Sequence, residues 1–258
     1  MQAAAHHGGA NRRRLSMTTD SPLFTLHNVR KARAQGPGYA LDITHLEIMP
    51  GETIAVTGAS GSGKSTALDI LGMALRPDTA ETFRLRVAGE NVDVARCWQR
   101  SEQDRLAALR LRHMGYVLQT GGLLPFVNVR RNMALTAEVN GLQGSAAQVR
   151  ELANMLGIGR LLDSMPGRLS VGERQRVAIG RALASKPAVI LADEPTAALD
   201  PHHAGAVLDM FLEVVASLGV TLILVTHDQN IVRSRRFKEL RITILPQPNG
   251  ASRAVLET

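Results

Sequence analysis

Three glycines, a lysine and a serine stand at a spacing that suits the binding of a phosphate. Residues 58–66 read Gly-Ala-Ser-Gly-Ser-Gly-Lys-Ser-Thr, between an apolar run over 52–57 that predicts a strand and a helical pattern over 67–71. Glycines let successive backbone amides point at phosphate oxygens, and the start of a helix adds partial positive charge. The lysine would reach the β- and γ-phosphates, and the serine hydroxyl would complete the coordination of Mg²⁺ carried in with the nucleotide. We expect the whole loop to bind nucleotide: Gly58, Ala59, Ser60, Gly61, Ser62, Gly63, Lys64, Ser65 and Thr66.

Two carboxylates follow another apolar run. Asp193 closes the aliphatic stretch 188–192, which predicts a carboxylate at the carboxyl end of a buried strand, beside the magnesium that Ser65 would hold. Glu194 comes next, where it could polarise the water that attacks a γ-phosphate. An acidic turn that merely caps the next helix is the alternative reading.

A second anion site is predicted at the start of a later helix. Ser170 and Glu173 form a capping-box pattern at the beginning of an amphipathic helix over 170–183. Gly172 allows close approach of the backbone, and the first turn offers a hydroxyl and helix-terminal amides. A plain capped helix explains the local sequence as well, so the pattern alone leaves both readings open.

The composition is that of a soluble enzyme-sized domain. The chain has 258 residues, 45% hydrophobic but only 3% aromatic, which disfavours a binder of single-stranded nucleic acid that stacks bases on aromatic rings. A net charge of +7 suits an anionic partner, either nucleic acid or the acidic face of a membrane, or reflects a generally basic surface. The single cysteine, Cys97, cannot form an internal disulfide, so a reducing cytosol fits best. No apolar run approaches the roughly 20 residues of a membrane-spanning helix.

Strand and helix patterns alternate along the chain and predict an α/β fold. Residues 23–29 and 41–48 alternate as half-buried strands do and predict an antiparallel β flap. Stretches 188–192 and 221–225 are continuous aliphatic runs, typical of parallel strands, and a helical pattern over 201–218 separates them. Residues 95–184 are mainly helical apart from a strand at 115–118. We therefore expect a disordered tail over 1–22, one domain over 23–247 with a mainly parallel core and an inserted helical subdomain at about 95–184, and a C-terminal tail over 248–258.

Taken together, these segments resemble the ATP-binding cassette ATPases, which have a P-loop NTPase core, from about residue 23 to 244. Residues 58–66 match the family's Walker A loop, 169–173 its signature motif, and 189–193 its Walker B strand, with Glu194 as catalytic glutamate. Gln119 resembles the Q-loop glutamine, Asp200 in Ala-Leu-Asp the D-loop, and His227 in Val-Thr-His-Asp the switch histidine. Six motifs in the family's order are far more specific than any one of them.

The resemblance implies a mechanism shared by two chains. In such proteins two cassettes pack head to tail, so the signature residues Ser170, Val171, Gly172 and Glu173 would act in trans on ATP held by the partner. Glu194, His227 and Gln119 would serve catalysis in cis, and Ser65, Gln119 and Asp193 would hold Mg²⁺. The implied partners are a second cassette and a separate membrane permease docked near Gln119 and residues 123–129, which places the chain in the cytoplasm on the inner face of the membrane.

Within the family, the strings at 114–125, 172–179 and 191–196 are similar to the cassettes of lipoprotein-release, macrolide-export and cell-division systems. Val171 departs from the usual signature glycine, and Glu173 replaces the common glutamine. The aromatic residue that stacks on adenine in the family is not found near residues 29–33, which leaves Arg33 or Tyr39 for that contact. Two other functions stay open: a soluble cassette ATPase that acts on DNA or ribosomes, and a regulatory cassette that binds ATP without transport.

Overall fold

A single ten-stranded mixed sheet organises the molecule. The computed structural model describes residues 21–32, 39–142, 145–246 and 252–257. The strand order is β5-β4-β1-β2-β10-β9-β3-β8-β7-β6. The strands are β1 (Phe24–Ala32), β2 (Tyr39–Ile48), β3 (Thr53–Gly58), β4 (Thr82–Val87), β5 (Glu90–Asp93), β6 (Met114–Val117), β7 (Val189–Asp193), β8 (Thr221–Val225), β9 (Lys238–Pro246) and β10 (Ser252–Glu257).

The sheet has an antiparallel half and a parallel half. Strands β2, β1, β4 and β5 pair antiparallel, whereas β9, β3, β8, β7 and β6 run parallel to one another. Strand β10 joins the two halves, because it pairs parallel with β2 and antiparallel with β9. The carboxyl ends of β3, β6, β7 and β8 therefore meet at one edge, where the loops that follow these strands come together.

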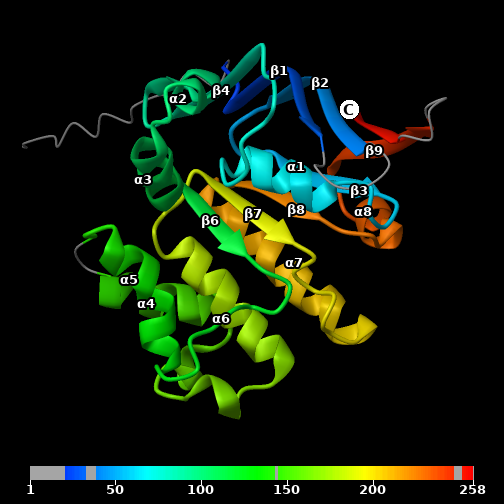
Figure 1. Ribbon diagram of the computed structural model, residues 1–258. Coiled ribbons are helices and arrows are strands. Elements are labelled where there is room, and N and C mark those ends of the chain that lie inside the picture. Colours follow the sequence, from blue (N-terminus) through cyan, green and yellow to red (C-terminus); the bar gives the residue numbers. More distant parts are fainter. Residues whose placement is uncertain (1–20, 33–38, 143–144, 247–251, 258) are drawn as a thin grey trace, which may run out of the picture.

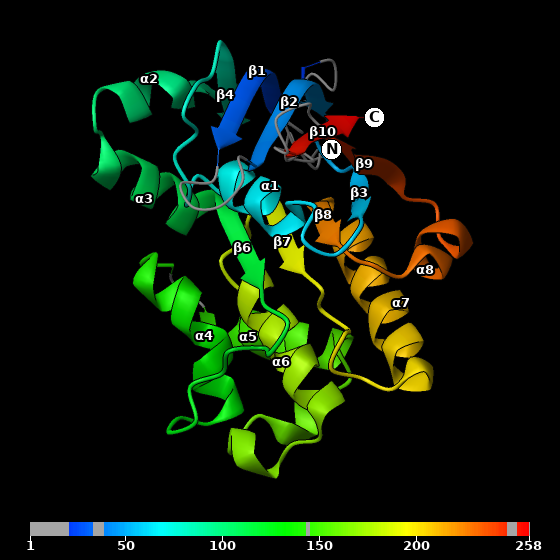
Figure 2. The ribbon, with the colours of Figure 1, turned by 45° about the vertical axis from the view of Figure 1, so that its right-hand side comes forward.

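Helices cover both faces of this sheet. They are α1 (Lys64–Leu71), α2 (Val94–Gln99), α3 (Gln103–His113), α4 (Val129–Val139), α5 (Ser145–Met155), α6 (Val171–Leu183), α7 (Pro201–Leu218) and α8 (Gln229–Ser234), with short 3-10 turns η1 (Gly159–Leu161) and η2 (Pro166–Arg168). Figures 1 and 2 show α4, α5 and α6 gathered in a lobe below the sheet, while α2 lies beside β4 and α3 lies between α2 and β6. None of the described helices is both long and apolar enough to cross a membrane.

The sheet separates two hydrophobic cores. In β7, Val189 and Leu191 join the core that contains α1, whereas Ile190 and Ala192 join the core that contains α6 and α7. Successive side chains of a strand point to opposite faces, so a strand covered on both faces is apolar throughout. The continuous aliphatic runs expected to be parallel strands are thus confirmed, and the α/β fold with an antiparallel flap is confirmed with them.

The structure adds strands that the sequence analysis did not predict. Residues 252–257, expected within a C-terminal tail, form β10 and bury Ala254, Val255 and Leu256 between β2 and β9. This part of the tail prediction is wrong, because these three adjacent apolar side chains are buried when the strand pairs with its two neighbours. Strands β4, β5 and β9 were not predicted either.

The helices of residues 95–184 divide between the two cores. Trp98 of α2 and Leu106 of α3 pack into the core of α1, whereas α4, α5 and α6 pack into the core of α7. We propose that the helical subdomain proper begins after β6. Residues 1–20 of the expected N-terminal tail lie outside the described residues.

Candidate nucleotide-binding site

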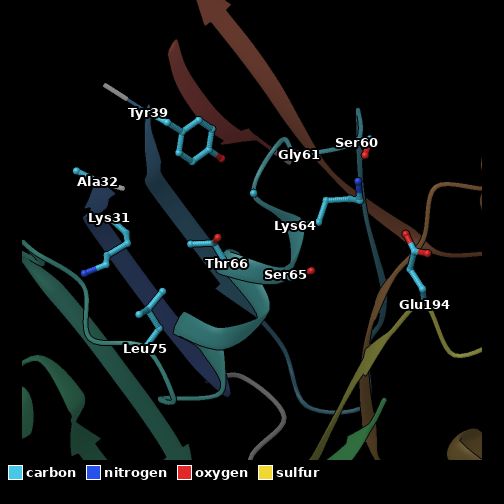
Figure 3. Close-up of a pocket in the computed structure, with 11 residues that line it drawn as sticks. Lys31, Ala32, Tyr39, Ser60, Gly61, Lys64, Ser65, Thr66, Leu75 and Glu194 are labelled. Carbon is cyan, nitrogen blue, oxygen red and sulfur yellow. The ribbon is translucent and has the colours of Figure 1, made fainter. Parts of the chain in front are cut away.

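A cavity of about 520 Å³ opens beside the first turn of α1 (Figure 3). Tyr39 stands on one side of the loop that connects β3 to α1, and Glu194 faces the loop from the other side, with Lys64 and Ser65 between them. Eight lining residues were predicted from the sequence: Tyr39, Ser60, Gly61, Gly63, Lys64, Ser65, Thr66 and Glu194. Lys31, Ala32 and Leu75 complete the wall.

The loop has the backbone that glycine permits. Gly63, at φ 98°, is the residue that caps α1, and Gly58 has φ 150°. A Cβ at Gly58 would stand 2.6 Å from Oγ of Ser62 and 2.9 Å from the carbonyl oxygen of Ile242. Any side chain at residue 58 would therefore push the loop away from β9, so the predicted need for glycine has a steric cause as well as a conformational one.

Lys64 is folded into the loop. Only 7% of the residue is exposed, and its Nζ donates to the carbonyl oxygens of Gly58, at 3.0 Å, and Ala59, at 2.9 Å. A buried ammonium group is stable only where such partners satisfy it. The two hydrogen bonds curve the loop around the lysine and keep a positive charge at its centre.

Ser65 and Asp193 meet although 128 residues separate them. The Ser65 hydroxyl donates to Oδ2 of Asp193 across 3.0 Å, from the first turn of α1 to the carboxyl end of β7. Hydroxyl and carboxylate oxygens are ligands that Mg²⁺ accepts, and this ion usually takes its remaining ligands from phosphate and water. The pair fits a Mg²⁺ ion that arrives with a nucleotide.

Glu194 and His227 form the next pair. Oε1 of Glu194 lies 3.1 Å from Nδ1 of His227, which follows β8. Glu194 has φ 44°, a left-handed conformation uncommon for residues with a side chain, and its amide donates to the carbonyl of Val225 at 3.0 Å. The backbone hydrogen bond to β8 holds this turn in place and aims the carboxylate into the cavity. Strained residues of this kind cluster at functional sites.

The signature residues lie elsewhere. Ser170 caps α6 through a complete capping box: its Oγ accepts from the amide of Glu173 at 3.2 Å, and the Glu173 carboxylate accepts from the amide of Ser170 at 2.9 Å. Ser170, Val171, Gly172 and Glu173 line a separate cavity of about 420 Å³ that shares no described residue with the nucleotide cavity. One protomer therefore does not bring the two predicted phosphate sites together.

Asp200 borders this second cavity. It caps α7 by accepting from the amide of His203 at 3.2 Å, and its Oδ2 lies 2.7 Å from the imidazole Nδ1 of the same residue. The backbone and side-chain hydrogen bonds from His203 lower the pKa of the Asp200 carboxyl. The carboxylate thus stays ionised next to the signature helix.

Two predicted residues stand apart from the nucleotide cavity. Gln119 is exposed two residues after β6 and is not among the residues that line the cavity. Arg33, one of the two candidates for the adenine contact, lies outside the described residues. Tyr39, the other candidate, lines the cavity.

A clamp that no sequence motif predicts shapes the far wall. Asp78 accepts from Nζ of Lys31 at 2.8 Å and from the amide of Ala32 at 2.7 Å, which ties the end of β1 to the loop that carries Leu75. The hydrogen bond from the Lys31 side chain, followed by that from the Ala32 amide, lowers the pKa of Asp78. No local signal could have revealed this clamp, because its partners are 46 and 47 residues apart in the chain.

Known proteins are similar to this chain in both sequence and fold. Residues 41–197 match the family model described as ABC transporter. The chain is 39% identical, over 81% of its length and 92% of the relative, to the lipoprotein-releasing system ATP-binding protein LolD of Novosphingobium aromaticivorans. It is 38% identical, over 92% of its length and 36% of the relative, to the macrolide export ATP-binding/permease protein MacB of Hyphomonas neptunium.

Among solved structures, a dimeric post-hydrolysis state of an ATP-binding cassette bound to ADP and Pi is similar to this chain. The TM-score is 0.66 at 27% identity, and the match covers 91% of this chain and 97% of the other. The family match spans more than half of the chain and includes the phosphate loop, the signature helix and the Ser65–Asp193 pair. On this evidence the chain belongs to the ABC transporter family, as one of its ATP-binding cassettes.

Proposed function

We propose that this chain is the subunit that binds and hydrolyses MgATP for a transporter whose permease is a separate membrane protein. The pairing of Ser65 with Asp193 beside Lys64, with Glu194 aimed into the same cavity, is the observation that carries the proposal. Lys64 would neutralise the β- and γ-phosphates, while Ser65 and Asp193 would hold Mg²⁺. Glu194 would polarise the attacking water, and His227 would orient the Glu194 carboxylate and sense the γ-phosphate.

A second cassette is needed to complete the site. The signature residues line a cavity distinct from the nucleotide cavity, so a γ-phosphate bound at Lys64 can meet Ser170 only if the latter comes from another copy. A symmetric head-to-tail dimer places each signature helix over the partner's phosphate loop. A solved neighbour is described as dimeric and bound to ADP and Pi, which supports this arrangement.

A groove beside Gln119 suits the permease. It has a volume of about 410 Å³ and lies between α3, β6, α4 and α6. Leu111 and Leu118 line it with exposed apolar side chains, whereas Leu123 packs mainly into the protein's own core. Exposed apolar side chains that gather around a groove are typical of interaction sites. We propose that an apolar segment of the permease lies here, which would place the chain on the cytoplasmic face of the membrane. Relatives named for lipoprotein release and macrolide export favour transport over a soluble role on DNA or ribosomes.

Substitution of Glu194 by Gln tests the proposed ATPase directly. The amide cannot accept the proton of the attacking water, so we expect steady-state phosphate release to fall by about 10²–10⁴-fold. MgATP binding, measured by calorimetry, should remain within about threefold, since Lys64 and Ser65 are intact. With hydrolysis blocked, size exclusion in MgATP should show a stable dimer. A wild-type protein without MgATP turnover, or a Gln variant with normal turnover, would remove Glu194 from this role.

Substitution of Leu118 by Glu tests the permease groove. Leu118 is 47% exposed beside Gln119, and a carboxylate there would place an unpaired charge in an apolar contact. We expect less of the tagged Leu118→Glu variant than of the wild-type protein in washed membranes of the host cell. ATP turnover of the purified variant should equal that of the wild-type protein. Substitution of Leu218, which is 46% exposed at the end of α7, by Glu is the matched control and should leave membrane retention unchanged. Equal retention of both variants would contradict this assignment of the groove.

A further inference from the structure

The phenol of Tyr39 is bonded to the phosphate loop. Tyr39 is the first residue of β2, and its hydroxyl donates to the backbone carbonyl of Ser62 at 2.5 Å. A Cβ at Gly63 would stand 3.2 Å from Cζ of Tyr39 and would clash with the hydroxyl oxygen. The loop therefore packs against the phenol at its last residue before α1, a contact that the expected role of Tyr39 at adenine does not explain.

This hydrogen bond fixes the peptide plane between Ser62 and Gly63. In a trans peptide the carbonyl and the following N–H point in opposite directions, and the described residues contain no cis peptide bond. With the Ser62 carbonyl held on the phenol, the amide of Gly63 points away from the Tyr39 ring. Gly63 is the N-cap of α1, and the amides at the start of a helix carry the partial positive charge that attracts anions.

The donor is itself held by the sheet. The Tyr39 backbone lies in register with Ser252 of β10, and the next residue, Ala40, pairs with Ala32 of β1. The phenol therefore reaches the loop from a strand fixed on both sides. A loop held in its binding conformation before the ligand arrives loses less conformational entropy on binding.

We propose that Tyr39 is a positioning residue whose hydroxyl preorganises the phosphate loop for a triphosphate, independently of any contact with the base. The inference rests on the proposed function, because it concerns the same cavity. This role of the Tyr39 hydroxyl differs from stacking of its ring on the base in one respect that can be measured. A hydroxyl that acts through the loop affects every triphosphate equally, whereas a ring that stacks affects only ligands that carry a base.

Substitution of Tyr39 by Phe removes the hydroxyl and keeps the ring. We expect the affinity for MgATP to fall by about three- to tenfold, the net effect of one hydrogen bond, and the affinity for magnesium tripolyphosphate to fall by the same factor. The second probe carries no base, and both are measured by competition against a fluorescent nucleotide. Amide hydrogen exchange of residues 58–66 in the ligand-free protein should become faster, a change that a stacking role would not produce.

Tyr116→Phe is the matched control. Tyr116 is the chain's other tyrosine, and its buried hydroxyl makes no hydrogen bond within the described residues. We expect this variant to retain both affinities and the exchange rates of the loop. Unchanged loop exchange and unchanged MgATP affinity in Tyr39→Phe would overturn the inference, as would a loss confined to MgATP. A wild-type protein that fails to bind MgATP would instead overturn the proposed function.

Discussion

Individual side chains in this site meet partners within the phosphate loop or in distant parts of the chain. Lys64 binds carbonyl oxygens of its own loop, Ser65 meets Asp193, and Glu194 meets His227. The structure thus brings together residues that follow three neighbouring parallel strands, β3, β7 and β8. The Lys64 charge lies where the β- and γ-phosphates would bind, and the Glu194 carboxylate that would direct water lines the same cavity, on the side away from Tyr39.

Substitution of Lys64 by Ala should weaken nucleotide binding itself. The change removes the charge that meets the phosphates and the two hydrogen bonds that curve the loop. We expect the dissociation constant for MgATP, measured by calorimetry, to rise by about tenfold or more, as for loss of a charge-assisted contact. Circular dichroism of the ligand-free variant controls for unfolding. Normal affinity in a folded variant would contradict the assignment of this loop.

At the scale of helices and strands, predictability depends on how local the signal is. The capping box of α6 and the span of α7 follow from short patterns, and the structure shows both. Strand β4 also has a local signal, because Phe83 and Leu85 are buried and Arg84 between them is exposed. This alternation of apolar and polar residues is typical of a strand, so β4 was predictable from the sequence. Strand β10 has no such alternation, because both of its faces are covered.

The same distinction applies to the site. The phosphate loop and Asp193 were predictable because each motif is contiguous and ends or follows a strand. The clamp of Asp78 on Lys31 and the bond from Tyr39 to Ser62 were not predictable, since they depend on strand pairing across the sheet. The structure also places Gln119 outside the nucleotide cavity, in a position that the motif order alone does not give.

Substitution of Ser170 by Ala tests the contribution of the helix cap. Loss of a serine cap costs about 1 kcal/mol, so we expect the melting temperature, followed by circular dichroism, to fall by about 2–4 °C in a chain of this size. Substitution of Glu173 by Gln is the control, because glutamine can make the same reciprocal hydrogen bond. If Ser170→Ala melts at the wild-type temperature, the cap seen at α6 adds nothing to stability.

At the scale of the whole molecule, two half-sites lie in separate cavities of one protomer. A head-to-tail dimer would join the phosphate loop of one copy to the signature helix of the other. This arrangement makes each active site depend on two chains, and so it predicts that two different inactive variants can repair each other.

Mixing Lys64→Ala with Gly172→Asp should restore activity. A Cβ at Gly172 would make only ordinary contacts, with Leu199 at 3.8 Å and Val207 at 3.9 Å, and the charge of an aspartate there would repel a phosphate bound in trans. Each variant alone should show little turnover, whereas random heterodimers contain one intact composite site, giving about a quarter of wild-type activity in a phosphate-release assay. No recovery in a mixture shown to exchange subunits would argue against sites shared between chains.

Strand β10 has a consequence for how the protein is made. Within the described chain it is the only strand that links the antiparallel half of the sheet to the parallel half. During translation, every other described strand is synthesised before residues 252–257. The strand pairing between the two halves can therefore form only at the end of synthesis. A nonsense codon shortly before residue 252 would release a polypeptide that holds every sequence motif of the site but lacks the strand that joins the two halves.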